Sequence, residues 1–114
     1  MDKPRYSSIT TLLNDAEIES VTINQYDRVY VKKGDSDCVL VDTFQSVEQY
    51  HLLIKEIIEI NNAEQLSMFP VWKVIDKESF VDYTLVITVS SPEVAGNGEY
   101  SVLIRKVKNV KGSR

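Results

Sequence analysis

The sequence predicts an α+β domain, in which one long and one short helix cover a mainly antiparallel sheet of about six strands. Three observations favour this class. Stretches that alternate apolar and polar residues outnumber the helical patterns. The turns that join the first three stretches are too short for crossover connections, so these strands must run antiparallel. Two segments have the apolar spacing of amphipathic helices, which predicts a two-layer sandwich with the order α-β-β-β-α-β-β-β.

Apolar spacing predicts the two helices. A short helix is expected over residues 7–14, with Ser7 or Ser8 as its N-cap. Its spacing of three and four comes from Ile9, Leu12 and Leu13. A long helix is expected over residues 47–61, and residues 46–49 fit a capping box. Its predicted buried face consists of Val47, Tyr50, Ile54, Ile57 and Ile58.

Six further segments have the alternation or the β-branched composition of strands. The predicted strands cover residues 21–24, 28–33, 38–42, 71–75, 81–91 and 100–107. Turn-forming residues separate the first three strands, and loops are expected over residues 63–70 and 92–98. Residues 1–107 are therefore predicted to form a single domain, followed by a basic tail or clipped linker over residues 108–114.

The composition of the chain argues against several classes of function. The chain has 114 residues and a net charge of −4, which argues against a nucleic-acid partner. No apolar run reaches the roughly 18 residues of a membrane span, and the first residues lack the apolar core of a signal peptide, so a cytoplasmic location is predicted. Cys38 follows a turn and begins an apolar run, and we expect it in the core. A reactive thiol is the weaker alternative, because no cation adjoins it.

The sequence predicts no active site. None of the four glycines belongs to a phosphate-binding loop, and one His with one Cys cannot build a zinc site. We therefore predict no catalytic residue, no metal and no enzymatic activity for this chain. His51 is expected at or near the surface, and the carboxylates of residues 35–37 and 76–82 in solvated turns. Phe69 and Trp72 are expected in the core, with an exposed partner anchor as the alternative.

Three strings resemble the N-terminal domain of the type II and type IV secretion and pilus-assembly ATPases, including those of tight-adherence pili. Residues 15–24 read DAEIESVTIN, residues 27–34 read DRVYVKKG, and residues 98–106 read GEYSVLIRK. Their order and spacing resemble the family over nearly the whole chain. Two departures stand out: residues 76–80 lack the Gly that the family carries in that turn, and the family's nucleotide-binding domain would begin after Val107.

The resemblance implies a non-catalytic bacterial domain that assembles and couples a secretion or pilus machine. Such a domain packs on a motor domain within a homo-hexameric ring, in the cytoplasm or at the inner membrane through its partners. ATP and Mg²⁺ would act only through that motor domain. Arg105 matches the arginine that approaches the nucleotide phosphates, and Arg28 is a weaker candidate. Alternatively, Arg105 pairs with an exposed carboxylate.

Two other functions stay open. The chain could be a stand-alone protein-binding or regulatory module of a secretion or pilus system, with a PAS-like fold that resembles a sensor domain. A small enzyme of another type is the least favoured, because the sequence offers no combination of nucleophile, base and orienting residue.

Overall fold

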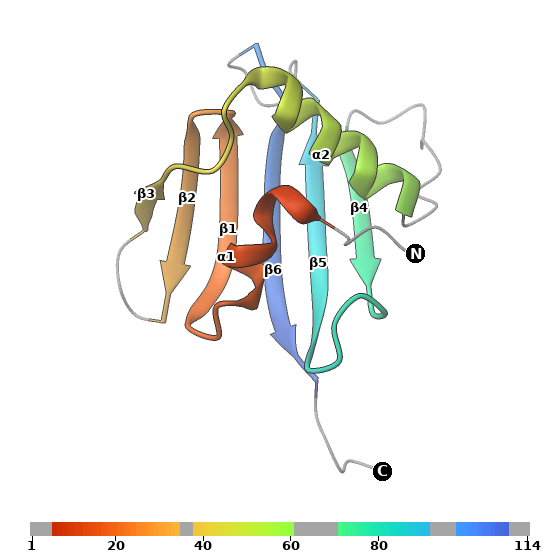
Figure 1. Cartoon of the computed structure of the whole chain (residues 1–114). Helices are drawn as coiled ribbons and strands as arrows, with labels where there is room; N and C mark the ends of the chain where they lie inside the picture. The colour runs from red at the N-terminus through yellow and green to blue at the C-terminus, as the bar shows by residue number, and fades with distance from the viewer. Residues whose placement is uncertain (1–5, 35–37, 61–70, 92–97, 110–114) are drawn as a thin grey trace.

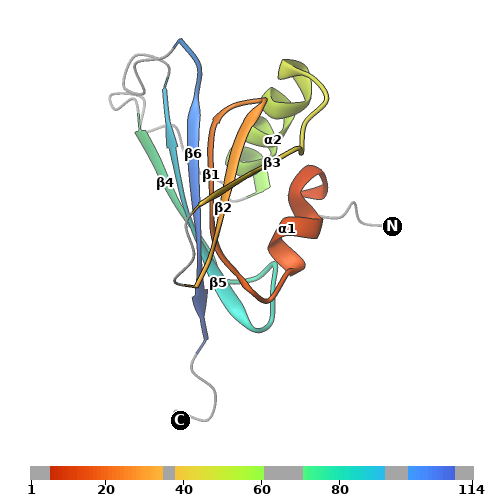
Figure 2. The same cartoon turned by 90° about the vertical axis from the view of Figure 1, so that its left-hand side faces the viewer.

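The computed structural model describes residues 6–34, 38–60, 71–91 and 98–109. Two helical segments lie on one face of a six-stranded sheet, and no helix among the described residues covers the other face, which we call the bare face (Figures 1 and 2). The elements in chain order are η1 (Ser7–Ile9), α1 (Thr10–Asn14), β1 (Ile18–Gln25), β2 (Arg28–Lys33), β3 (Val39–Val41), α2 (Val47–Ile60), β4 (Val71–Asp76), β5 (Tyr83–Ser90) and β6 (Ser101–Lys108). This confirms the predicted class and order.

The sheet consists of two antiparallel meanders that meet at its centre. The strand order is β3-β2-β1-β6-β5-β4, and all five pairings are antiparallel. The first and last strands of the chain pair with each other, from Ser20 opposite Arg105 to Ile23 opposite Val102. The connection through α2 runs from one edge strand to the other, so this helix crosses over the sheet (Figure 1).

The core lies between the helices and one face of the sheet. Alternate residues of the central strands point toward the helices and are buried, including Val21, Ile23, Leu85, Ile87, Val102 and Ile104. The buried side of α2 consists of Tyr50, Leu53, Ile54 and Ile57, so the predicted face is correct except that Leu53 was omitted and Val47 and Ile58 are only half-buried. Each fully buried aliphatic side chain contributes about 1.5–3 kcal/mol to folding.

The two helix starts differ in how well the sequence predicted them. The capping box of α2 is present: Ser46 Oγ accepts from the Gln49 amide at 3.3 Å, and Gln49 Oε1 accepts from the Gln45 amide at 2.8 Å. The serine N-cap of the first helix is wrong. A 3-10 turn precedes α1, whose N-cap position is Ile9, with no side-chain capping bond.

Cys38 is exposed, and its predicted burial is wrong. It precedes β3, which is an edge strand, and the neighbouring Val39 and Leu40 are exposed as well. Strand β5 also begins later than predicted, because residues 81–82 belong to a bend. The side chains of Phe69 and Trp72, the end of the predicted long helix and the greater part of both predicted loops lie outside the described residues.

Candidate functional site

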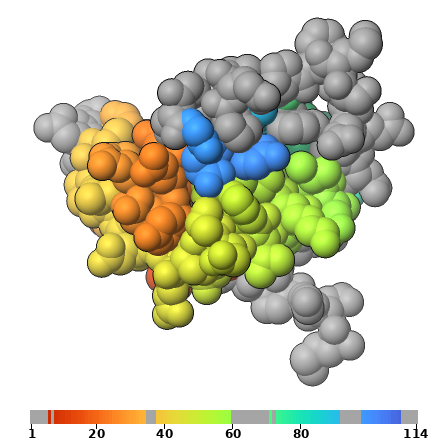
Figure 3. All heavy atoms as spheres, turned by 90° about the horizontal axis from the view of Figure 1, so that it is seen from above, coloured from red at the N-terminus to blue at the C-terminus, as the bar shows by residue number. Residues whose placement is uncertain are grey.

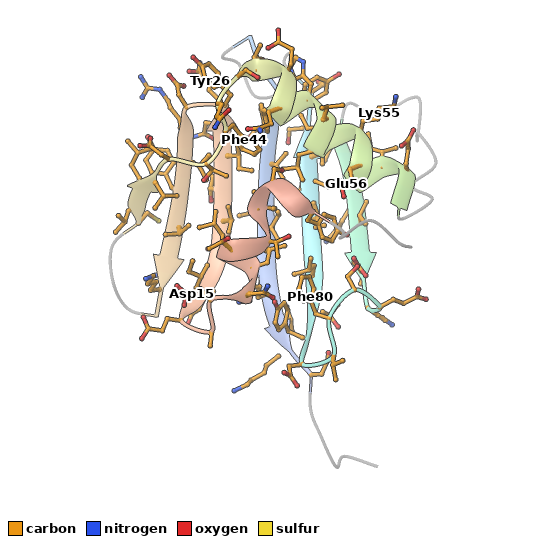
Figure 4. All side chains as sticks on the ribbon, viewed as in Figure 1. Asp15, Tyr26, Phe44, Lys55, Glu56 and Phe80 are labelled. Carbon is orange, nitrogen blue, oxygen red and sulfur yellow. The ribbon has the colours of Figure 1, made fainter. Side chains whose placement is uncertain are left out.

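The sheet splits at one end, between its two central strands. Pairing of β1 with β6 stops at Ser20 and Arg105. Beyond this point β6 continues beside β5 until Lys108 lies opposite Tyr83, whereas β1 passes through a bulge and continues beside β2. Because each strand follows its outer neighbour, the two halves of the sheet separate. We call this the split end; Figure 4 labels Asp15 and Phe80 there.

A hollow of about 1220 Å³ lies at the split end. It is bordered by the connection from α1 to β1, the bend before β5 and the last residues of β6. The charged side chains that line it are Glu19, Lys32, Asp82, Arg105, Lys106 and Lys108. Four of these six are cations, although the chain as a whole is acidic. The hollow therefore favours an anionic ligand or an acidic surface.

Lys106 has a structural role in this hollow. Its Nζ donates to the Asp15 carbonyl oxygen at 2.8 Å, across the gap between the strands, and lies 4.5 Å from the centre of the Tyr83 ring. Burial lowers the pKa of Lys106. The Tyr83 hydroxyl donates to the Leu13 carbonyl, and its ring stacks on Phe80 with centroids 4.8 Å apart. These contacts engage Lys106, so the cations of the hollow that can face a ligand are Lys32, Arg105 and Lys108.

Arg105 is exposed on the face of β6 that points away from the helices. Its cross-strand neighbours are Ser20 on β1 and Val86 on β5. Among the described residues it forms no ion pair, so the predicted alternative of pairing with an exposed carboxylate finds no support there. Its guanidinium can offer a planar fork of donors to an oxyanion.

Arg28 lies away from this hollow. It is the first residue of β2 and pairs with Gln25, whereas Arg105 pairs with Ser20. The separation along β1 is roughly 17 Å. Figure 4 labels Tyr26, in the turn that precedes Arg28, at the end of the sheet opposite Asp15. The structure therefore does not bring the two predicted arginines into one site.

The opposite end of the sheet is closed by packing. Tyr50 donates from its hydroxyl to the Tyr100 carbonyl at 2.7 Å, which ties α2 to the segment before β6. Seen from above, atoms of α2, of the β1–β2 turn and of the start of β6 lie directly against one another (Figure 3). Burial raises the pKa of the Tyr50 phenol above its ordinary value, so the hydroxyl can keep donating this bond in alkaline solution as well as at neutral pH.

His51 lies at the surface, as predicted, and forms a pair with Glu99. The distance from Nε2 to Glu99 Oε1 is 2.9 Å, and the imidazole meets the Tyr100 ring edge-on. Burial of the Glu99 carboxyl raises its pKa, but the hydrogen bonds from His51 and the Tyr100 amide outweigh this and lower the pKa. Within the described ranges, no group of three or more His, Cys, Asp or Glu side chains could hold a metal ion.

Asp76 contradicts the prediction of a solvated turn, because it is only 4% exposed. Its carboxylate accepts from the Tyr6 hydroxyl and Ser79 Oγ, both at 2.5 Å, and from the Glu78 and Ser79 amides at 2.9 and 3.0 Å. The sequence contains a pattern that indicates this burial. Asp76 is two residues after Val74, so both side chains lie on the core side of β4. Ser79, three residues after Asp76, favours a turn held by side-chain hydrogen bonds.

Comparison with known proteins finds a solved structure of similar fold. No family model matches the sequence, and no curated protein matches it. A solved structure of the VirB11 ATPase from the Brucella suis type IV secretion system, in complex with sulphate, is similar with a TM-score of 0.67 and 18% identity. The match covers 96% of this chain and 32% of that chain. The chain thus has a secretion-ATPase-like fold and spans about a third of the ATPase's length.

No helix among the described residues is long and apolar enough to cross a membrane.

Proposed function

We propose that this chain is a non-catalytic assembly and coupling domain of a secretion or pilus machine. The observation that carries the proposal is the likeness in fold: nearly all of this chain matches about a third of a type IV secretion ATPase. The strings around β1, β2 and β6 add support, since they occur in the order typical of the N-terminal domains of such ATPases. The partner would be a motor domain that binds ATP and Mg²⁺, arranged with this domain in a hexameric ring.

Arg105 is the residue we propose to face the nucleotide of that motor domain. It is exposed at the border of a hollow with a cationic lining, and the described residues do not pair with it. Lys32 is two strands away in the same row of the sheet, about 10 Å distant. A phosphate group between them would receive charge-assisted hydrogen bonds from one or both cations. Arg28 would not share this contact, because it lies at the other end of the sheet.

The proposal is tested by isolating the native protein from its own cells under mild conditions. We expect the 114-residue chain alone to hydrolyse no ATP. We expect the native preparation to contain a phosphate-loop ATPase, in the same polypeptide or bound to it, and Arg105→Ala to lower its ATP turnover without dissociating it. Magnesium-dependent hydrolysis by this chain alone, or a native preparation with no such ATPase, would overturn the proposal.

A stand-alone regulatory module is the second candidate, and one observation favours it. The chain closes its own core: Ile9 and Leu13 from the first helical segment and four residues of α2 are buried against the sheet. A domain that needed a motor domain to cover this face would leave these side chains exposed. The mass of the native polypeptide distinguishes the two candidates, because a fused motor domain would make it far larger than 13.0 kDa.

A further inference from the structure

The bare face of the sheet displays two rows of side chains that the strand register defines. The arginine row consists of Lys32, Ser20, Arg105, Val86 and Ile75, on β2, β1, β6, β5 and β4. The tyrosine row consists of Leu40, Tyr30, Thr22, Leu103, Thr88 and Lys73, and crosses all six strands. Neighbouring members are about 5 Å apart across the sheet. Both helical segments lie on the other face, so neither row is covered by them (Figure 2).

Large apolar side chains are exposed on this face. Leu40 and Ile75 are 55% and 57% exposed near the two edges, Leu103 is 38% exposed at the centre, and Val107 is 42% exposed toward the split end. Between them lie short hydroxyl side chains and the half-buried Tyr30 and Val86. Apolar side chains gathered on one face of a monomer indicate an interaction surface.

The charge on this face is of one sign. At the paired strand positions that point away from the helices, the charged residues are Arg28, Lys32, Lys73 and Arg105, all cations. Two carboxylates adjoin these strands: Glu19 lies in the β1 bulge at the border of the hollow, and Asp27 lies in the turn directly before Arg28. Within the described ranges these cations form no ion pairs, in contrast to Lys33, which pairs with Asp15. The rest of the chain is acidic, since the net charge is −4.

We propose that the bare face docks an acidic protein surface with an apolar centre, such as an amphipathic helix whose leucines are flanked by glutamates. This inference rests on the proposed function for the existence of a partner protein, and it adds the surface and the chemistry. Helix on sheet is the usual way to cover a half-exposed sheet. Carboxylates on the partner would meet the four unpaired cations, while its apolar side chains would cover Leu103, Val86 and Ile75.

The same observations disfavour other partners. A second copy docked face to face would bring cations against cations, which costs free energy. A nucleic acid would require a dominant basic field or a platform of aromatic rings, and Tyr30 is the aromatic residue in these rows. An anionic membrane attracts dense basic clusters, whereas these cations are spread over four strands among apolar and hydroxyl side chains.

The test uses the 114-residue protein, labelled with ¹⁵N, and a synthetic amphipathic peptide of leucines and glutamates, about 20 residues long so that it is helical alone. We expect amide shifts at residues of the two rows, and affinity that falls at least about fivefold when glutamine replaces every glutamate of the peptide. Arg105→Glu and Lys73→Glu should each weaken binding several-fold, as should raising the salt from 0.05 to 0.5 M, as an order-of-magnitude expectation.

The matched control is Lys55→Glu, which reverses an exposed cation on α2 and should leave the affinity unchanged. Folding of each variant is checked by its circular dichroism spectrum. If Arg105→Glu does not fold, Arg105→Gln replaces it. No binding, shifts confined to the helices, or equal affinity for the glutamine peptide would overturn the inference. Tighter binding of phosphatidylserine vesicles or a single-stranded oligonucleotide to the same rows would overturn it as well. The proposed function is tested by a different measurement, the presence of an ATPase in the native preparation. Failure of the peptide to bind therefore does not decide the proposed function.

Discussion

Tyr6 joins the N-terminal helical segment to two distant parts of the chain. Its buried hydroxyl donates to Asp76 Oδ2 at 2.5 Å, at the end of β4, and its backbone N–H donates to Glu56 Oε2 at 2.7 Å, on α2. Its backbone has φ 56°, a left-handed conformation that residues other than glycine rarely adopt. Such a conformation costs about 1–3 kcal/mol and persists where surrounding contacts enforce it. We therefore predict that Tyr6→Phe destabilises the whole domain.

The size of the effect follows from the partners of Asp76. A hydrogen bond to an ionised group contributes about 1.5–3 kcal/mol, and Tyr6→Phe removes one while the ring stays in the core. Asp76 keeps three other donors, from Ser79 and the Glu78 amide, so the carboxylate is not left unpaired. Asp76→Ala should cost more, at least about 3 kcal/mol, because it also leaves the buried Tyr6 hydroxyl without this acceptor.

Equilibrium unfolding in urea, followed by circular dichroism, measures both changes. The matched control is Tyr26→Phe, which removes the same hydroxyl from an exposed tyrosine and should change the unfolding free energy by less than about 0.5 kcal/mol. If Tyr6→Phe destabilises the protein no more than Tyr26→Phe does, the hydroxyl does not hold the segment and the reasoning is refuted.

The same carboxylate gives the stability a pH dependence. Burial raises the pKa of Asp76, but the hydrogen bonds from the Ser79 and Tyr6 side chains and from two backbone amides outweigh this and hold the pKa below its ordinary value. The unfolded chain therefore takes up the proton first, near about pH 4. The contribution is present above that pH and is lost as the pH falls through the folded-state pKa. Asp76→Asn should flatten the stability curve in this acidic range.

Three further predictions concern packing, exposure and the surface pair. Ile54→Ala should cost about 2–5 kcal/mol in urea unfolding, and Arg105→Ala less than about 0.5 kcal/mol, because the first side chain is buried and the second is exposed. Cys38 should react fully with a thiol reagent in the folded protein, and slow reaction limited by unfolding would contradict its exposure. His51→Ala should raise the pKa of Glu99 in an NMR titration, since it removes a hydrogen bond that lowers it; an unchanged pKa would contradict that contact.

Local patterns were enough to predict the elements and the class of the fold. The alternation over residues 28–33 predicted β2, and in the structure Val29 and Val31 are buried while Arg28 is exposed, because side chains of a strand alternate between its faces. Cys38 was misplaced because an apolar run does not reveal whether its strand lies at the centre or the edge of a sheet. Edge position depends on the strand order, which here results from pairing of the first strand with the last.

The candidate site was harder to predict, for a similar reason. Arg105 was predicted as a site residue from the sequence of residues 98–106, and its exposure agrees with a binding role. The hollow beside it arises because β1 bulges between Ile18 and Ser20 and so leaves β6. A bulge is a property of two paired strands, and one strand's sequence does not reveal its partner's register. Tyr6 was missed because its partners, Glu56 and Asp76, are 50 and 70 residues away.

Arg105 belongs both to the hollow and to the arginine row, so its substitution alone cannot separate a nucleotide contact from protein docking. Lys73 can, because it lies at the far end of the tyrosine row on β4 and does not line the hollow. A surface that docks an acidic partner should be weakened by Lys73→Glu as well as by Arg105→Glu. A phosphate contact made only at the hollow should respond to Arg105→Ala and be indifferent to Lys73. Comparing these two cations in the assembled protein therefore assigns each effect to its own part of the sheet.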